Sequence, residues 1–135
     1  MSRKMNEAEL KKRTKEFALR AMRLARALPK RTDARAIADQ LVRCATSVGA
    51  NYRAACRARS KAEFVAKLGI VEEEADESAF WLELIVEGAL MKKAMVQALL
   101  DEANEIVAII AASRKSASRP SAPRSKIANQ KSKMR

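Results

Sequence analysis

The scarcity of turn-forming residues is the feature that most constrains the fold of this chain. It has three glycines and three prolines in 135 residues, and hydrophobic residues, many of them alanine, make up 48% of it. Because few turns leave long uninterrupted segments, the sequence predicts long helices. Aromatic residues, which β-sandwiches and barrels use in their cores, make up only 4%. The chain is long enough to bury the core of one domain and too short for two.

Apolar residues recur at intervals of three and four along the chain, which is the period of an amphipathic helix. The first predicted helix runs from about Asn6 to Leu28 and stops before Pro29, because a residue that precedes proline leaves helical geometry. The second starts near Thr32 or Asp33, since either side chain can accept the free amide hydrogens of a first turn.

The third predicted helix begins at Ser60 and Glu63, which form a capping-box pattern before an apolar run. A break is expected between residues 88 and 92, and the fourth helix then ends near Arg114. Because short connections join successive helices, the sequence predicts an all-α fold, an antiparallel up-down-up-down four-helix bundle in residues 1–115.

The same spacing predicts which side chains are buried. In chain order, the predicted core residues are Leu10, Phe17, Ala21, Leu24, Leu28, Ile37, Leu41, Cys44, Val48, Tyr52, Ala55, Phe64, Leu68, Val71, Ala75, Ser78, Leu82, Ile85, Ala89, Val96, Leu99, Ala103, Ile106 and Ile110. A second line of apolar residues, Ile70, Trp81 and Leu84, is expected to widen the buried face of the third helix. Gly49 lies inside the second helix, where glycine costs up to about 1 kcal/mol relative to alanine. We expect it to let another helix approach closely.

The composition changes at residue 116. Residues 116–135 are rich in serine, contain two prolines and carry six Lys and Arg with no Asp or Glu. Such a segment buries too little apolar surface to offset the entropy lost on ordering. The sequence therefore predicts a disordered basic tail.

Positive charge is concentrated in the first half of the chain. The net charge is +12; residues 1–60 carry sixteen Lys and Arg against five Asp and Glu, while residues 61–90 carry two against eight. One interpretation is a solvated surface with intramolecular pairs, such as Arg43 with Glu74 or Glu77. The other is a phosphate-binding face, which the twelve excess cations favour. The candidate phosphate contacts are Arg20, Arg23, Arg53, Arg57, Arg59, Arg119, Arg124 and Lys126.

The chain lacks most of the residue patterns that enzymes use as general bases, metal ligands or nucleophiles. There is no histidine, which removes the commonest general base and metal ligand. The acidic cluster at residues 72–77 has no Glu-x-x-His partner of the kind a di-metal bundle uses, so we expect a charge-paired helix face and no metal or other cofactor. Cys44 and Cys56 lie twelve residues apart on one helix, about 18 Å, which is beyond disulfide reach. We expect a protein without catalytic activity.

The remaining signals concern location and ligand. No stretch approaches the roughly 20 apolar residues that cross a bilayer, and the charged N-terminus lacks the apolar core of a signal peptide, so we expect a cytoplasmic protein. The chain has no helix-turn-helix or zinc-finger spacing and no aromatic-rich surface that could stack bases. Nucleic-acid binding would therefore be led by backbone contacts with weak sequence preference.

One further pattern lies in residues 40–85, at Gln40, Leu41, Arg43, Ser47, Val48, Asn51, Arg59, Ser60, Glu63 and Phe64. At these positions the chain resembles the four-helix family of rRNA intervening-sequence proteins. The upstream pattern F-x-x-R-x-x-x-L-A-x-x-L-P, from Phe17 to Pro29, is similar to the family's first helix, and the resemblance covers about residues 15–112. The chain departs from it at residues 52–55, where Tyr-Arg-Ala-Ala replaces the Ile-Ala-Glu-Gly of many members.

This resemblance implies a four-helix subunit that assembles in related members into a ring-like homopentamer. The family is named for reading frames within intervening sequences of large-subunit rRNA genes. A related branch is the accessory variability protein of diversity-generating retroelements, a basic pentamer that binds nucleic acid and partners a reverse transcriptase. Two hypotheses follow: an oligomeric nucleic-acid-binding accessory protein, or a scaffold that docks an acidic partner such as a reverse transcriptase.

Overall fold

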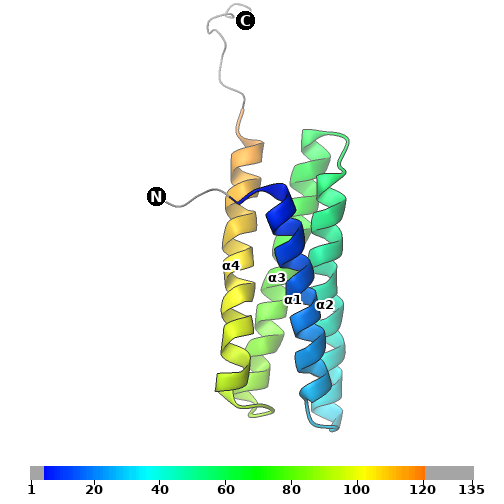
Figure 1. Ribbon diagram of the computed structural model, residues 1–135, viewed down its shortest axis with the longest axis vertical. Coiled ribbons are helices and arrows are strands. Elements are labelled where there is room, and N and C mark those ends of the chain that lie inside the picture. The colour runs from blue at the N-terminus through cyan, green and yellow to red at the C-terminus, as the bar shows by residue number, and fades with distance from the viewer. Residues whose placement is uncertain (1–4, 121–135) are drawn as a thin grey trace, which may run out of the picture.

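The computed structural model describes residues 5–120, which form four antiparallel helices (Figure 1). They are α1 (Glu7–Ala27), α2 (Thr32–Cys56), α3 (Lys61–Glu87) and α4 (Lys93–Ser118). Each helix packs against the next in the chain, and a sparser contact between α1 and α4 closes the bundle. The predicted all-α, up-down-up-down fold is confirmed. Within residues 5–120, no helix is long and apolar enough to span a membrane.

Side-chain caps set the starts of α1 and α3. The Asn6 side chain accepts a hydrogen bond from the Glu9 amide at 2.8 Å, and the Glu9 carboxylate accepts one from the Asn6 amide at 3.0 Å. The Ser60 hydroxyl accepts the Glu63 amide at 3.0 Å, as predicted. The Glu63 carboxylate, however, accepts the amide of Arg59 at 3.2 Å rather than that of Ser60. These bonds satisfy amide hydrogens that have no partner within a first helical turn.

The start of α2 differs in detail from the prediction. The helix begins at Thr32, and Arg31 is the capping residue, but its side chain makes no capping hydrogen bond. Asp33 accepts the amide of Ala34 at 2.8 Å and pairs with the Arg31 guanidinium at 2.9 Å. The hydrogen bond from Arg31 is the main reason that the pKa of Asp33 is lowered. The acid thus stabilises the first turn as a charge near the positive helix end.

The predicted apolar stripes form the core. Phe17, Leu41, Leu82 and Ile106 are among its largest fully buried side chains. Five predicted core residues are only half-buried, namely Leu24, Ile37, Phe64, Trp81 and Leu84. The prediction that Ile70 is buried is wrong, because its side chain lies on the outer face of α3 and is exposed. Ala89 is exposed because α3 ends before it. Ser78 is buried as predicted, and its hydroxyl donates to the Glu74 carbonyl at 2.8 Å, so its polar group is satisfied inside the core.

The fourth helix is longer than predicted. It ends at Ser118, four residues beyond the expected end near Arg114, so residues 116–118 are helical and not part of a tail. Arg114 donates to the Glu72 carboxylate of α3 at 2.6 Å, and Lys61 donates to the Arg119 carbonyl at 2.8 Å. These contacts hold the last turn of α4 against α3. Residues 119 and 120 follow the helix, and residues 121–135 of the predicted tail lie outside the described residues.

The turn between α3 and α4 contains a strained alanine. The amides of Ala89 and Leu90 donate to the carbonyls of Val86 and Ile85, both at 3.0 Å, which is the Schellman pattern of a helix end. This pattern needs a left-handed residue, and Ala89 takes that role with φ of 57°. The preceding Gly88 keeps a negative φ of −82°. The glycine therefore lies one position before the place where it would relieve strain.

We expect Ala89→Gly to raise the free energy of unfolding by about 1 kcal/mol, because glycine adopts the left-handed conformation without the Cβ penalty. Denaturant unfolding followed by circular dichroism measures the change. Ala108→Gly, at an exposed position inside α4, is the matched control and should lower it by about 1 kcal/mol. Equal destabilisation by both substitutions would contradict this account of the turn.

Candidate nucleic-acid interface

A basic groove of about 560 Å³ runs along the seam between α1 and α2. Its lining residues are Lys11, Lys12, Lys15, Ala18, Thr46, Gly49, Ala50, Arg53 and Arg57. Five of these nine carry a positive charge and none is acidic. The groove is therefore a concave surface of one sign of charge, which concentrates anions from solution.

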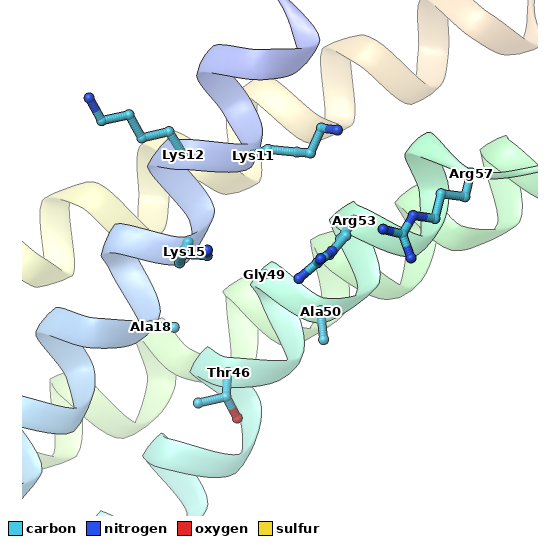
Figure 2. Close-up of a pocket in the computed structure, with 9 residues that line it drawn as sticks. All are labelled: Lys11, Lys12, Lys15, Ala18, Thr46, Gly49, Ala50, Arg53 and Arg57. Atoms are coloured by element: carbon cyan, nitrogen blue, oxygen red, sulfur yellow. The ribbon is translucent and has the colours of Figure 1, made fainter.

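The cations stand on both walls of this groove. Figure 2 shows the lysines on α1 and the arginines on α2, with Lys11 extended toward α2 and Lys12 directed away over the rim. Lys11 and Lys15 lie four residues apart, as do Arg53 and Arg57. That spacing is one helical turn, about 6 Å along each axis. Two rows of charge thus face each other across the seam.

Gly49 makes the close approach of α1 and α2 possible. A Cβ atom at this position would lie 3.3 Å from the carbonyl oxygen of Thr14 on α1, closer than most such contacts allow. Thr14 is buried, and its hydroxyl donates to the Leu10 carbonyl at 2.8 Å, so the side chain occupies no space in the groove. The predicted role of Gly49 in helix packing is confirmed, and the glycine also forms part of the groove floor.

The groove cations have no partners among the described carboxylates. Lys12, Lys15, Arg53 and Arg57 make no ion pair within residues 5–120, and all four are exposed. Arginines elsewhere differ: Arg13 of α1 pairs with Glu102 and Glu105 of α4, in each case at 2.6 Å. The groove thus keeps its positive charge available to a ligand.

Ion pairs tie the other three seams of the bundle together. Arg13 donates two hydrogen bonds to the Glu102 carboxylate, and hydrogen bonding to this carboxylate is the main reason that the pKa of Arg13 is raised above its usual range. Arg43 of α2 pairs with Glu74 at 3.4 Å and also with Glu77 of α3, as predicted. Hydrogen bonds from Trp81 and then Arg43 lower the pKa of Glu77. These pairs involve four of the eleven Asp and Glu residues on α3 and α4.

The structure separates the eight predicted phosphate contacts. Arg53 and Arg57 lie together in the groove. Arg20 and Arg23 line a different hollow, on the α1/α4 seam, and Arg23 pairs with Glu16 at 3.3 Å. Arg59 and Arg119 lie at the end of the bundle opposite the α1–α2 connection. Arg124 and Lys126 lie outside the described residues.

Sequence reasoning missed the three lysines that complete the groove. Lys11, Lys12 and Lys15 were not among the candidates because arginine was weighted for its match to phosphate. Two sequence features point to these lysines: Lys11 and Lys15 share a helix face, and Gly49 marks a place where another helix comes close. What the sequence did not show is which helix Gly49 contacts.

Neither cysteine is a reactive thiol at neutral pH. Cys44 is buried, with its sulfur 3.1 Å from the Ser78 hydroxyl oxygen, and burial raises its pKa. Burial also raises the pKa of the half-buried Cys56, to about 11. Because the thiolate is the nucleophile, both groups stay protonated and unreactive. Among the described residues, no three His, Cys, Asp or Glu side chains are grouped to hold a metal ion.

Comparison with known proteins places this bundle in a family. The model of the 23S rRNA-intervening sequence protein family matches residues 6–112, and the chain belongs to that family. A crystal structure of a protein of unknown function from the S23 ribosomal protein family of Bacteroides thetaiotaomicron is 31% identical to the chain. The two agree with a TM-score of 0.76 over 82% of this chain and 99% of the other. No curated protein matches this chain.

The close contact at Gly49 gives a stability test of the groove floor. We expect Gly49→Val to lower the free energy of unfolding by about 1 to 3 kcal/mol, because the new side chain must push α1 away. Gly69→Val is the control, since a Cβ at Gly69 meets only the Arg114 side chain at 3.9 Å. Urea unfolding of both variants measures the difference. If Gly49→Val leaves the free energy of unfolding unchanged, α1 and α2 need not pack this closely.

Proposed function

We propose that this protein is a non-enzymatic, oligomeric accessory protein that binds the phosphate backbone of nucleic acids through the α1/α2 groove. The observation that carries the proposal is the concave surface with five cations, no acid and no described ion pair for Lys12, Lys15, Arg53 or Arg57. The groove cations would release counterions that are condensed on the nucleic acid, and the bound phosphates would relieve the repulsion between the groove walls.

The geometry favours a chain of phosphates over a single small anion. The charges form two rows along the helices rather than one cluster around a point, so successive phosphates would find successive cations. Arg53 and Arg57 offer planar forks that match phosphate oxygens, while the lysines act as mobile point charges. Arg20, Arg23, Arg59, Arg119, Arg124 and Lys126 remain proposed as outer contacts.

The lining favours weak sequence preference. Among the nine described residues that line the groove, Thr46 has the only uncharged hydrogen-bonding side chain, and none is aromatic. Base edges would therefore find few donors or acceptors and no ring on which to stack. The family name refers to intervening sequences of 23S rRNA. This makes RNA the first ligand to test, with DNA beside it.

A second candidate is a scaffold that docks an acidic protein such as a reverse transcriptase. The same groove supports it, because carboxylates and phosphates both attract these cations. The resemblance to accessory variability proteins of diversity-generating retroelements motivates this partner, as well as the proposed homopentamer. In either case we propose a cytoplasmic protein with no cofactor.

Neutralising the groove should weaken nucleic-acid binding. We expect the double variant Lys15→Gln with Arg53→Gln to lose at least about tenfold in affinity at low salt, since a hydrogen bond to a charged group contributes about 1.5 kcal/mol or more. The slope of log affinity against log salt should fall by about 1 to 2. Fluorescence anisotropy with labelled single-stranded RNA and duplex DNA, at several salt concentrations, measures both quantities.

The control removes the same charge from another place. Lys30→Gln with Lys93→Gln acts at the far end of the bundle, on exposed residues outside the groove. Arg124→Gln with Lys126→Gln tests the C-terminal cations in the full chain. If all three double variants lose affinity equally, only the net charge of the chain matters, and the groove is rejected as the binding site. If the unmodified chain shows no salt-sensitive binding, nucleic acid is the wrong ligand, and purified reverse transcriptase becomes the partner to test.

A further inference from the structure

The outer face of α3 carries acids that no described basic residue neutralises. Exposed residues recur there at intervals of three and four, which places them on one side of the helix. This α3 stripe consists of Glu73, Asp76, Phe80, Glu83 and Glu87. Its four acids form no ion pair within residues 5–120. The α3 stripe therefore attracts cations and repels nucleic acid.

An exposed aromatic ring stands in the middle of the α3 stripe. Phe80 is 49% exposed, with two acids of the stripe before it and two after it. Its ring meets the Trp81 ring edge-on, with centroids 5.1 Å apart, and the indole N–H of Trp81 donates a hydrogen bond to Glu77 at 3.0 Å. A single exposed hydrophobic residue is normal on a protein surface. Here the ring is flanked by unpaired acids, so the stripe fits a segment with cations on both sides of an apolar residue.

The last residues of the chain have this complementary pattern. Residues 121–135 contain five Lys and Arg and no Asp or Glu. Arg124 and Lys126 precede Ile127, and the other three cations follow it at positions 131, 133 and 135. Ile127 thus stands between two groups of cations, as Phe80 stands between two pairs of acids. The family model ends at residue 112, so membership of the family does not imply this match.

The chain leaves the bundle at one end of α3. Helix α4 ends at Ser118, and Lys61 at the start of α3 donates a hydrogen bond to the Arg119 carbonyl at 2.8 Å. Phe80 lies nineteen residues after Lys61, which is about 28 Å along a helix. Ile127 lies eight residues after Arg119, and an extended chain covers about 26 Å in that interval. A segment that runs along α3 from Arg119 therefore brings its apolar residue level with Phe80.

An acidic hollow of about 460 Å³ lies on this path. It is on the α3/α4 seam and is lined by Gly69, Glu72, Glu73, Asp76, Val107 and Arg114. Arg114 pairs with Glu72 at 2.6 Å, so Glu73 and Asp76 are the charges of the hollow without an ion pair within residues 5–120. The hollow thus offers room and negative charge to the two cations that precede Ile127.

We propose that residues 121–135 bind the α3 stripe of their own chain. The two cations before Ile127 would face the two acids before Phe80, and the later cations would face the two acids after it. Exposed ion pairs contribute little one by one, so the same segment free in solution would bind weakly. Its covalent attachment beside the stripe supplies a high effective concentration instead. This inference goes beyond the proposed function and does not depend on nucleic acid.

Charge reversal on each side of the contact tests the proposal. Glu73→Lys with Glu83→Lys changes the α3 stripe, and Arg124→Glu with Lys131→Glu changes the C-terminal segment. The measurement is NMR relaxation of nuclease-treated, ¹⁵N-labelled full chains at low salt. We expect the order parameter of the Ile127 amide to exceed about 0.6 in the unmodified chain and to fall below that value in each double variant.

The chain with all four substitutions is the decisive sample. It exchanges charges across the contact, so binding should return and the order parameter of Ile127 should recover. Asp39→Lys with Asp101→Lys is the matched control, because it changes the net charge as much as the stripe variant does, on exposed residues of α2 and α4. This control should leave Ile127 as restrained as in the unmodified chain.

A second reporter lies on the other side of the contact. Trp81 is the single tryptophan, so its indole N–H gives one signal, next to Phe80. This signal should shift when the C-terminal segment alone is changed by Arg124→Glu with Lys131→Glu, although that variant alters nothing on α3. Added salt should produce the same release, because it screens exposed charges.

Four results would overturn the proposal. These are an Ile127 order parameter below about 0.6 in the unmodified chain, no recovery in the chain with four substitutions, no effect of salt, or a loss of order on dilution. The last result would place the segment on another molecule. Binding of RNA by the α1/α2 groove is measured separately and uses other residues, so failure of this proposal can be told apart from failure of the proposed function.

Discussion

Repulsion between like charges along the α1/α2 groove is the constraint on which the proposed function depends. Lys11 and Lys15, and likewise Arg53 and Arg57, stand one helical turn apart, a spacing at which like charges destabilise a helix by a few tenths of a kcal/mol per pair. The groove persists because buried residues on the inner faces of the same helices, such as Phe17 and Val48, hold α1 and α2 in place. An anion in the groove would remove this repulsion, so the free protein already contains part of the driving force for binding.

The groove keeps its charge because none of its described lining residues is acidic, and several acids pair with arginines on other seams. Glu102 and Glu105 hold Arg13 across the α1/α4 seam, and Glu72 holds Arg114 against α3. Glu102 is the best protected of these acids, with a side chain only 15% exposed, so its pair with Arg13 is less screened than a surface ion pair. Acids on α3 and α4 therefore stabilise three seams of the bundle, and the α1/α2 seam relies on the close backbone contact at Gly49.

The sequence predicted the elements of the fold well and the site only in part. Helix period and caps are local properties, which is why the bundle, the core and the pairing of Arg43 with α3 followed from spacing. The end of α4 was missed because Arg114 and Lys61 stabilise its last turns through contacts with α3, which composition does not show. Ala89 was assigned to the core because the apolar period continues through the turn that ends α3. The groove lysines depend on which helix meets Gly49, and that is a property of the packed structure.

The α1/α2 groove and the hollow on the α1/α4 seam use different residues of α1. In an assembly that covers the hollow, Arg20 and Arg23 would be enclosed, whereas the α1/α2 groove would stay open to solvent in every copy. Each groove offers only a few phosphate contacts, so a single copy would bind weakly and lose affinity rapidly with salt. A ring or filament would present several such grooves to one nucleic-acid strand, and the second contact would then form at a high effective concentration. Assembly would thus convert a weak, sequence-tolerant site into a stable one without any new base contact.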